Sequence, residues 1–471
     1  MLWVFLSSLA VAAMYIAAFL CALQAASTAR TPQGAVGWVV FLLATPFIGI
    51  PAYLFLGHHR ISGYQVSRRE SKRVIDGIRD FATTHAPDPE ISPIPFGPFE
   101  HCADMPVLRG NAMGLLINGE QTFDVIFDAI DDAKFYVLVQ FYIIHDDTIG
   151  RALRDRLIAA AKRGVTVRLL TDGVGSYSLP ASYFDTLRAG GVTVADPGGA
   201  PGPRHRFQIN YRNHRKTVVI DGSSGFTGGL NVGNEYTGND PTFGPWRDTH
   251  IRLSGPMVLQ LQLIFAEDWH WATGELLLDD LNWQTERTEE DMPGLIVATG
   301  PSDLSETGSL MFFSAISAAR NRLWIASPYF VPDMDIVTAL RHAALRGVDV
   351  RLMVPDMADH HLPWLAAHAY FDAVRSDGVR IFRYSEGFMH QKVFVVDDDL
   401  AAVGTSNLDN RSFRLNFETM ALFFDNRAAA QVDAMLREDF TRCFELTEDL
   451  SQQSPYVRWG APVARLFAPL L

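Results

Sequence analysis

Two stretches of the chain share one pattern, and together they decide the fold. Residues 214–231 read HRKTVVIDGSSGFTGGLN, and residues 390–407 read HQKVFVVDDDLAAVGTSN. Histidine, lysine, aspartate, glycine and asparagine stand at the same offsets in both: His214, Lys216, Asp221, Gly228 and Asn231 in the first, and His390, Lys392, Asp397, Gly404 and Asn407 in the second. So many matched positions are not expected by chance, and they indicate a duplication.

Each copy, called a box below, predicts a strand, a turn and a second strand. A β-branched run at 217–220 or 393–396 leads into an aspartate-containing turn, and a further apolar run follows. Because successive strand residues point to opposite faces, the histidine and lysine of one box share a face. Each box therefore presents an imidazole beside an ammonium group.

A longer repeat surrounds the boxes. From about residue 108, helical patterns alternate with buried-strand runs, and the same series returns later in the chain. Tyr142 and Tyr329 are 187 residues apart, whereas His214 and His390 are 176 apart, as in duplicated domains with loop insertions. Strands that alternate with helices predict an α/β fold of two tandem halves, joined near residues 296–308.

The N-terminal residues predict a membrane anchor. Residues 2–24 and 35–57 are almost wholly apolar, and about 23 helical residues span roughly 34 Å, enough for a hydrocarbon core of about 30 Å. A cleaved signal peptide is the alternative for the first run, but residues 1–24 contain no lysine or arginine. We therefore expect two transmembrane helices.

Flanking charges predict the orientation of this anchor. The connecting loop carries only Arg30, whereas six basic residues follow the second apolar run: Arg60, Arg68, Arg69, Lys72, Arg73 and Arg79. Positive residues stay inside, so we expect a multi-pass protein of the inner (cytoplasmic) membrane with both termini and the catalytic region in the cytoplasm. A second role of this basic segment, gathering anionic lipid, is left open.

The expected domains are the anchor at 1–60, a basic and proline-rich segment at 61–107, a first half at 108–297 and a second half at 298–471. Six prolines between 82 and 107 predict an extended linker. The tail after residue 452 suits either an interfacial amphipathic helix or ordinary packing against the domain.

Composition narrows the function. The net charge is −13, which disfavours a protein that wraps nucleic acid, because such binding needs a basic surface. The three cysteines are widely spaced and form no zinc or redox motif, and no P-loop or metalloprotease motif is present. We expect no metal and no cofactor.

With these residues in view, the chain resembles the phospholipase D superfamily, whose single active site is built from two copies of His-x-Lys-x4-Asp-x6-Gly. Three flanking stretches, 213–216, 246–250 and 416–418, are similar to those of bacterial cardiolipin synthases, and the resemblance covers nearly the whole chain. It implies two phospholipase D-like halves with a shared site, which transfer a phosphatidyl group between two phosphatidylglycerol molecules and release glycerol.

Two histidines and two lysines suit metal-free attack on a phosphodiester. One imidazole attacks the phosphorus while the other protonates the leaving alkoxide and later deprotonates the incoming alcohol. The resemblance favours His214 as the nucleophile and His390 as the acid/base. Lys216, Lys392, Asn231 and Asn407 are expected to hold the phosphate oxygens.

Each catalytic histidine needs a group that sets its tautomer. Relatives carry an orienting acid at the position of Glu418, 28 residues beyond His390. The first half has Thr242 at that offset, so Asp248 is the nearest candidate there and Glu235 the second. Asp221 and Asp397 belong to the motif, but their place at turns favours a structural role over acid/base work.

Other groups carry weaker signals. For His145, His250 and His368 we expect structural or surface positions. Arg204, Arg206, Arg212 and Arg215 form either a phosphate-recruiting mouth or a solvated loop.

The rival functions are a membrane-bound phospholipase D, another phosphatidyltransferase such as a phosphatidylserine synthase, a membrane-bound nuclease and a non-catalytic membrane scaffold. Anionic phospholipid and the membrane are the expected partners, without nucleic acid. The sequence leaves the oligomeric state open.

Overall fold

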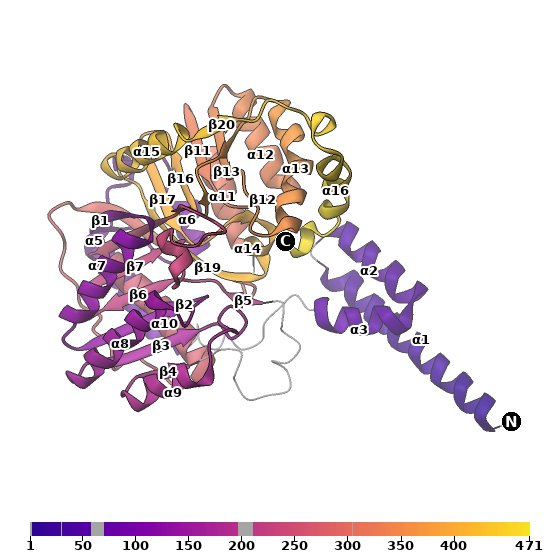
Figure 1. Ribbon diagram of the computed structural model, residues 1–471, viewed down its shortest axis with the longest axis horizontal. Coiled ribbons are helices and arrows are strands. Elements are labelled where there is room, and N and C mark those ends of the chain that lie inside the picture. The colour runs from indigo at the N-terminus through magenta and orange to yellow at the C-terminus, as the bar shows by residue number, and fades with distance from the viewer. Residues whose placement is uncertain (1, 30, 58–69, 196–210, 304) are drawn as a thin grey trace. The chain divides into compact units, whose positions relative to one another are not determined.

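The computed structural model describes residues 2–29, 31–57, 70–195, 211–303 and 305–471 (Figure 1). The chain divides into a helical N-terminal unit within residues 1–62 and a large α/β unit that holds most of the rest. Each unit is described by itself.

The described residues of the N-terminal unit form α1 (Leu2–Thr28), α2 (Pro32–Ala44) and α3 (Pro46–Leu56). Among the described residues, one stretch is long and apolar enough to cross a membrane, Ser7–Thr28 with a mean hydropathy of 2.0. Leu42 and Tyr53 are buried in the small core of this unit.

The single helix expected over 35–57 is not present. It breaks at Thr45 (φ −137°, ψ 63°), because Pro46 has no N–H to donate and disfavours helical geometry in the residue before it. The Trp38 and Tyr53 ring centroids lie 5.1 Å apart, although a straight helix would separate these residues by about 22 Å. The helix α3 therefore folds back on α2.

The expected extended linker at 82–107 is also wrong. The segment contains the end of α5 (Lys72–His85), a short 3-10 helix η1 (Pro89–Ile91) and α6 (Gly97–Ala103). Pro98 lies in the first turn of α6, where a missing N–H costs nothing. Phe99 and Val107 are buried in the main core, so this segment belongs to the α/β unit.

One mixed sheet runs through both halves in the order β20-β14-β13-β11-β16-β17-β19-β10-β1-β9-β7-β6-β2-β3-β4. The first-half strands are β1 (Leu108–Ile117), β2 (Tyr136–Phe141), β3 (Thr166–Thr171), β4 (Thr193–Ala195), β6 (Thr217–Ile220), β7 (Ser224–Gly228) and β9 (Thr249–Ser254). The second-half strands are β10 (Met292–Thr299), β11 (Arg322–Ala326), β13 (Asp349–Pro355), β14 (Arg380–Tyr384), β16 (Val393–Val396), β17 (Leu400–Gly404), β19 (Asn416–Phe423) and β20 (Cys443–Glu445).

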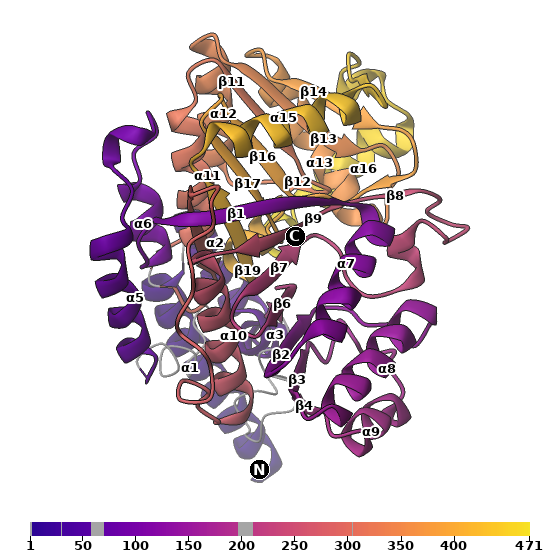
Figure 2. The same cartoon turned by 90° about the vertical axis from the view of Figure 1, so that its left-hand side faces the viewer.

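The sheet order reads as a duplication about its centre. The strands β1 and β10 pair antiparallel there, and each later strand of the first half has a counterpart at the same distance on the other side. Figure 2 shows β1 crossing the view, with β11, β13, β14 and β16 of the second half above it and β6, β2, β3 and β4 of the first half below it. The predicted α/β fold with tandem halves is confirmed, but the predicted boundary at 297/298 cuts through β10, because the second half begins with that strand.

The other described helices cover the faces of the sheet or pack on helices that do. They are α7 (Asn118–Asp132), α8 (Thr148–Lys162), α9 (Ala181–Ala189), α10 (Met257–Thr273), α11 (Thr307–Ala318), α12 (Met334–Leu345), α13 (His361–Arg375), α14 (Asn410–Arg414), α15 (Asn426–Phe440) and α16 (Pro455–Arg465), with 3-10 helices η4 (Asn234–Thr237), η5 (Leu450–Gln452) and η6 (Ala468–Leu470). Residues 257–269 of α10 are all buried, and its apolar side chains join strands of both halves in one core.

Five two-residue strands complete the fold: β5 (Arg212–Asn213), β8 (Trp246–Arg247), β12 (Phe330–Val331), β15 (Phe388–Met389) and β18 (Leu408–Asp409). Three of them link the halves in two pairings, because β5 pairs with β19 and β15 pairs with β8.

Candidate active site

The two box histidines are placed by the short strands that join the halves. His214 follows β5, and its N–H donates to the carbonyl of Phe417 at 3.0 Å. His390 follows β15, and its N–H donates to the carbonyl of Arg247 at 2.8 Å. His214 thus lies beside Glu418, the residue after Phe417, and His390 lies beside Asp248, the residue after Arg247.

The carboxylate that orients each histidine therefore comes from the other half. His214 Nδ1 lies 2.8 Å from Glu418 Oε2, and His390 Nδ1 lies 2.9 Å from Asp248 Oδ2. The expected pairing of Glu418 with His390 is wrong: the pairs cross the interface. With Nδ1 engaged, Nε2 of each ring remains for chemistry.

Strand register explains why the offset of 28 residues did not identify the orienting acid in the first half. Gly228 pairs with His250 and Gly404 pairs with Met420, so Asp248 and Glu418 are equivalent positions. Asp248 lies 34 residues beyond His214 but Glu418 only 28 beyond His390, because the loop containing η4 is longer. The second candidate, Glu235, pairs instead with His145 at 3.5 Å.

Burial controls the charge of these groups. It lowers the pKa of His214 to about 4 and lowers that of His390, so both rings are neutral near pH 7. Burial opposes ionisation of Glu418 and Asp248, but their histidine and lysine neighbours hold both carboxyl pKa values below the ordinary range. A neutral imidazole with a free Nε2 can act as a nucleophile.

The box lysines lie fully buried next to the histidines. Lys216 Nζ donates to the His214 carbonyl at 2.8 Å, and Lys392 donates to that of His390. Burial lowers the pKa of Lys392 to about 8 and that of Lys216 well below its usual value. A bound phosphodiester anion would favour the charged form of both lysines.

The box asparagines line the cavity between the halves. Asn231 accepts from the N–H of Ile143 at 3.2 Å and donates to Tyr236 at 3.3 Å. Asn407 is buried, and its Oδ1 has no partner among the described residues.

The motif aspartates are not in the cavity. Asp221 accepts from the backbone N–H groups of residues 134–136, and Asp397 accepts from those of residues 320–322. Both have a left-handed backbone, with φ of 53° and 50°. Each aspartate ties the turn after its box strand to the loop that precedes β2 or β11. These contacts support a structural role for Asp221 and Asp397 and do not support a catalytic one.

The cavity has a volume of about 730 Å³ and holds both histidines on its wall. The Tyr142 ring lies 5.0 Å from that of His214. Burial and the charge of Asp172 raise the pKa of Tyr142, whereas Arg212 and Arg411 oppose this shift. At His390, Asp248 and Asp359 oppose the burial that lowers the histidine pKa. Two arginines that line the cavity thus act beside His214, and Asp359 acts beside His390.

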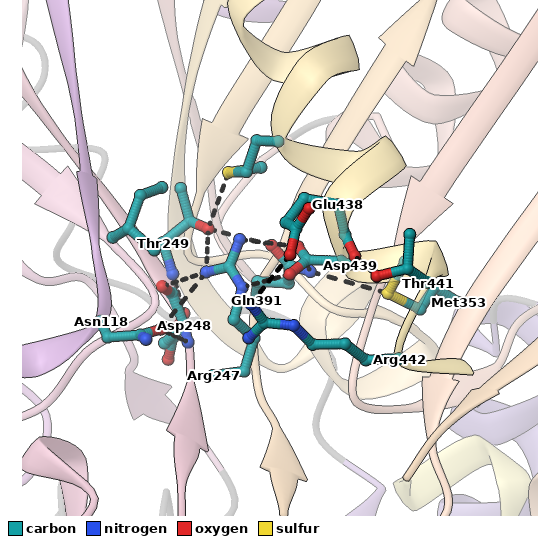
Figure 3. A network of polar contacts seen from close by, with 12 residues as sticks. Asn118, Arg247, Asp248, Thr249, Met353, Gln391, Glu438, Asp439, Thr441 and Arg442 are labelled. Atoms are coloured by element: carbon teal, nitrogen blue, oxygen red, sulfur yellow. Dashed lines mark hydrogen bonds and ion pairs between the residues drawn. The ribbon is translucent and has the colours of Figure 1, made fainter. Parts of the chain in front are cut away.

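Buried ion pairs support both sides of the site. Arg247 donates to Asp439 on α15 at 2.7 Å, and Gln391, between His390 and Lys392 in the second box, donates to the same carboxylate at 3.0 Å (Figure 3). In the first box Arg215 pairs with Asp268 at 2.5 Å. Arg215 is thus buried and belongs neither to a recruiting mouth nor to a solvated loop.

Of the other arginines and histidines in question, Arg212 lines the cavity, and Arg204 and Arg206 lie outside the described residues. His145 and His368 have structural partners, Glu235 and the Trp364 carbonyl. The described residues contain no group of three or more potential metal ligands.

Two histidines with crossed carboxylate partners on the wall of one interfacial cavity, each next to a buried lysine, define a phosphodiester-transfer site of the phospholipase D type. The comparisons agree. A model described as the phospholipase D-like domain of cardiolipin synthase matches residues 126–241 and 312–440, and a phospholipase D-nuclease N-terminal model matches 13–58. A cardiolipin synthase A of Pseudomonas putida is 45% identical over 97% of both chains, and that of Pseudomonas syringae is 44% identical over 96% of this chain and 95% of that one. The chain belongs to the cardiolipin synthase family.

A solved structure supports the fold. The crystal structure of phosphatidylserine synthase from Haemophilus influenzae superposes with a TM-score of 0.61 over 80% of this chain and 99% of that one, at 15% sequence identity.

One buried histidine yields a test of stability. Neither ring nitrogen of His250 has a partner among the described residues, and burial lowers its pKa to about 3. In the unfolded chain this ring is protonated below about pH 6.5, whereas in the folded protein it stays neutral down to about pH 3. The histidine therefore lowers the free energy of unfolding as the pH falls from about 6.5 toward 3. The other half has Met420 at this position.

We expect His250→Met to gain about 2 kcal/mol over the wild type between pH 8 and pH 5. Thermal unfolding in detergent at both pH values measures this, with His342→Met, at an exposed position of α12, as the control. An equal difference between variant and wild type at both pH values would contradict the assignment.

Proposed function

We propose that the chain converts two phosphatidylglycerol molecules to cardiolipin and glycerol through a phosphohistidine. The observation that carries this proposal is the pair of oriented histidines in one cavity, in a member of the cardiolipin synthase family. No nucleotide enters the reaction, because one phosphodiester is exchanged for another.

In the first step, His214 Nε2 attacks the phosphorus of the donor. The N–P bond forms, the bond to the glycerol oxygen breaks, and His390 gives that oxygen a proton. Glu418 holds the proton on Nδ1 of His214, and the bound phosphate anion beside His390 favours its protonated form.

In the second step, His390 takes the proton of the acceptor hydroxyl, whose oxygen attacks the phosphorus. The N–P bond breaks and His214 is released. Lys216 and Lys392, with the amides of Asn231 and Asn407, neutralise the phosphate oxygens in both steps.

The polarity of the cavity supports a glycerol head group on the His390 side. Both the departing and the incoming glycerol must lie within reach of the acid/base, where Asp359 also lines the cavity. Asp359 is held by the Tyr329 hydroxyl and lies 3.0 Å from His360 Nδ1, and its side chain is 11% exposed. A fixed carboxylate of this kind accepts hydrogen bonds from vicinal hydroxyls.

We also propose that α1 crosses the inner membrane and that the α/β unit lies on the cytoplasmic side, where Lys72, Arg73 and Arg79 follow the anchor. The fold-back of α3 on α2 favours a hairpin of about 20 Å that enters and leaves on one side, in place of the second crossing expected from the sequence.

Incubation of the purified protein with phosphatidylglycerol vesicles, without nucleotide, should give cardiolipin and glycerol in equal amounts by lipid mass spectrometry. His214→Ala and His390→Ala should each lower the rate of cardiolipin formation by a factor of about 10² to 10⁴ or more. Phosphatidic acid as the main product would make the protein a phospholipase D, and appreciable synthesis by either variant would remove the two-histidine mechanism.

The crossed pairs predict which carboxylate belongs to which step. With a phosphatidyl p-nitrophenol donor the phenolate leaves without a proton, so His390→Ala and Asp248→Asn should still release one equivalent of phenolate in a burst. His214→Ala should give no burst, and Glu418→Gln a slower one. Stopped-flow absorbance records the burst, and a normal burst from Glu418→Gln with a slow one from Asp248→Asn would reverse the assignment.

Asp359 should select a polyol acceptor. A hydrogen bond to a charged group is worth about 1.5 to 3 kcal/mol, so Asp359→Asn should lower cardiolipin formation by roughly 10- to 100-fold. Transfer to ethanol, which lacks the second hydroxyl, should change little. Asp356→Asn is the control, because Asp356 lies in the same loop, pairs with Arg383 and does not line the cavity. An equal loss with both acceptors would assign Asp359 a structural role.

A further inference from the structure

The helix α16 has one side that the domain accounts for. Val457, Ala461 and Ala464 are buried, and the helix packs along α13. Ser454 caps its N-terminus by accepting from the Val457 N–H at 3.4 Å. The helix is therefore fixed to the α/β unit and its orientation is set.

The other side of α16 is apolar and exposed. The side chains are Tyr456, Trp459, Val463, Leu466 and Phe467, with exposed fractions between 47% and 78%. Their spacing of three and four residues places them along one side of the helix and the turn after it. Single exposed apolar residues are normal, but a continuous stripe of this size marks an interaction surface.

Charge around the stripe indicates what covers it. Residues 454–471 contain Arg458 and Arg465 but no aspartate or glutamate, in a chain with a net charge of −13. The Arg458 guanidinium lies 5.5 Å from the Trp459 ring, at the edge of the stripe. Tryptophan, tyrosine and arginine around an aliphatic stripe suit the interface of an anionic bilayer.

The stripe also leads into the catalytic cavity. The chain continues from α16 through η6 to Leu470 and Leu471, which line the cavity. The Arg411 N–H donates to the Leu471 carbonyl at 2.7 Å, and Asn410 donates to that of Ala468 at 3.2 Å. Leu362, at the start of the helix on which α16 packs, is 40% exposed and lines the same cavity.

We propose that the exposed side of α16 docks on the surface of an anionic phospholipid bilayer and places the mouth of the cavity against the lipids of that leaflet. The proposal rests on the proposed function for the identity of the lipid substrate, but the contact itself does not require turnover. Docking supplies lipid from the bilayer and leaves water on the other sides of the unit.

Photo-crosslinking tests the contact in the full-length protein, reconstituted in vesicles of phosphatidylglycerol and phosphatidylcholine. Benzoylphenylalanine in place of Trp459 or Leu466 should form lipid adducts, detected by mass spectrometry. In place of Leu345 or Tyr177, which are 68% and 83% exposed on other elements, it should form at least tenfold fewer. Equal adducts at all four positions, or protein adducts at 459 and 466, would overturn the proposal.

A kinetic test separates docking from catalysis. The double variant Trp459→Glu, Leu466→Glu should lose at least tenfold in cardiolipin formation from vesicles, through a raised apparent KM. Its rate on monomeric short-chain phosphatidylglycerol should stay within about twofold of the wild type. Leu345→Glu is the control.

An equal loss on vesicles and monomers would show a structural role for α16 and overturn the proposal. If the wild type makes no cardiolipin from either substrate, the proposed function fails, whereas the crosslinking result still decides the docking.

Discussion

The structure depends on two imidazole–carboxylate contacts that cross between the halves. Neither half can orient its own histidine, because Glu418 holds His214 and Asp248 holds His390. The backbone enforces this exchange, since each histidine follows a two-residue strand that pairs with the two residues before the opposite carboxylate. The central pairing of β1 with β10 and the shared core around α10 keep the halves in the one arrangement that forms both contacts.

Two buried ion pairs lie next to these contacts. In each half a buried aspartate on a helix is paired with an arginine, but the arginine comes from a different position in the two halves. Asp268 on α10 is met by Arg215 from within the first box, whereas Asp439 on α15 is met by Arg247, which precedes the orienting Asp248. The positions opposite are filled by Gln391 and Phe417, and Phe417 packs on the Arg215 guanidinium at 5.3 Å. A buried pair of this kind is costly to break, because removal of one partner leaves an uncompensated charge.

Much of this arrangement could be predicted from the sequence. The two boxes gave the duplication, the strand runs around them match β2, β3, β11 and β13, and the histidines do meet in one cavity. The crossed pairing could not be predicted, because it depends on strands from opposite halves that lie side by side. The offset from histidine to carboxylate also did not transfer between the halves, because one loop is six residues longer. The pairing of Gly228 with His250 and of Gly404 with Met420 is what identifies Asp248 and Glu418 as equivalent.

The effect of proline was predicted wrongly at two places. Pro46 ends the expected second helix, whereas Pro98 lies within a helix, because the effect of proline depends on its position in the helical turn. Arg215 was expected near solvent because its partner Asp268 is 53 residues away in the sequence.

The antiparallel contact of β1 with β10 has a consequence for the origin of the chain. Strands that are equivalent in the two halves meet at the pseudo-twofold axis, which is the geometry of an isologous dimer interface. Two copies of a single-half ancestor would have formed the same cavity with two identical histidines, each held by the neighbouring subunit. Joining the copies into one polypeptide removed that identity, so that arginines could gather beside one histidine and an aspartate beside the other. Fusion thus allowed the two ends of a symmetric cavity to acquire different side chains.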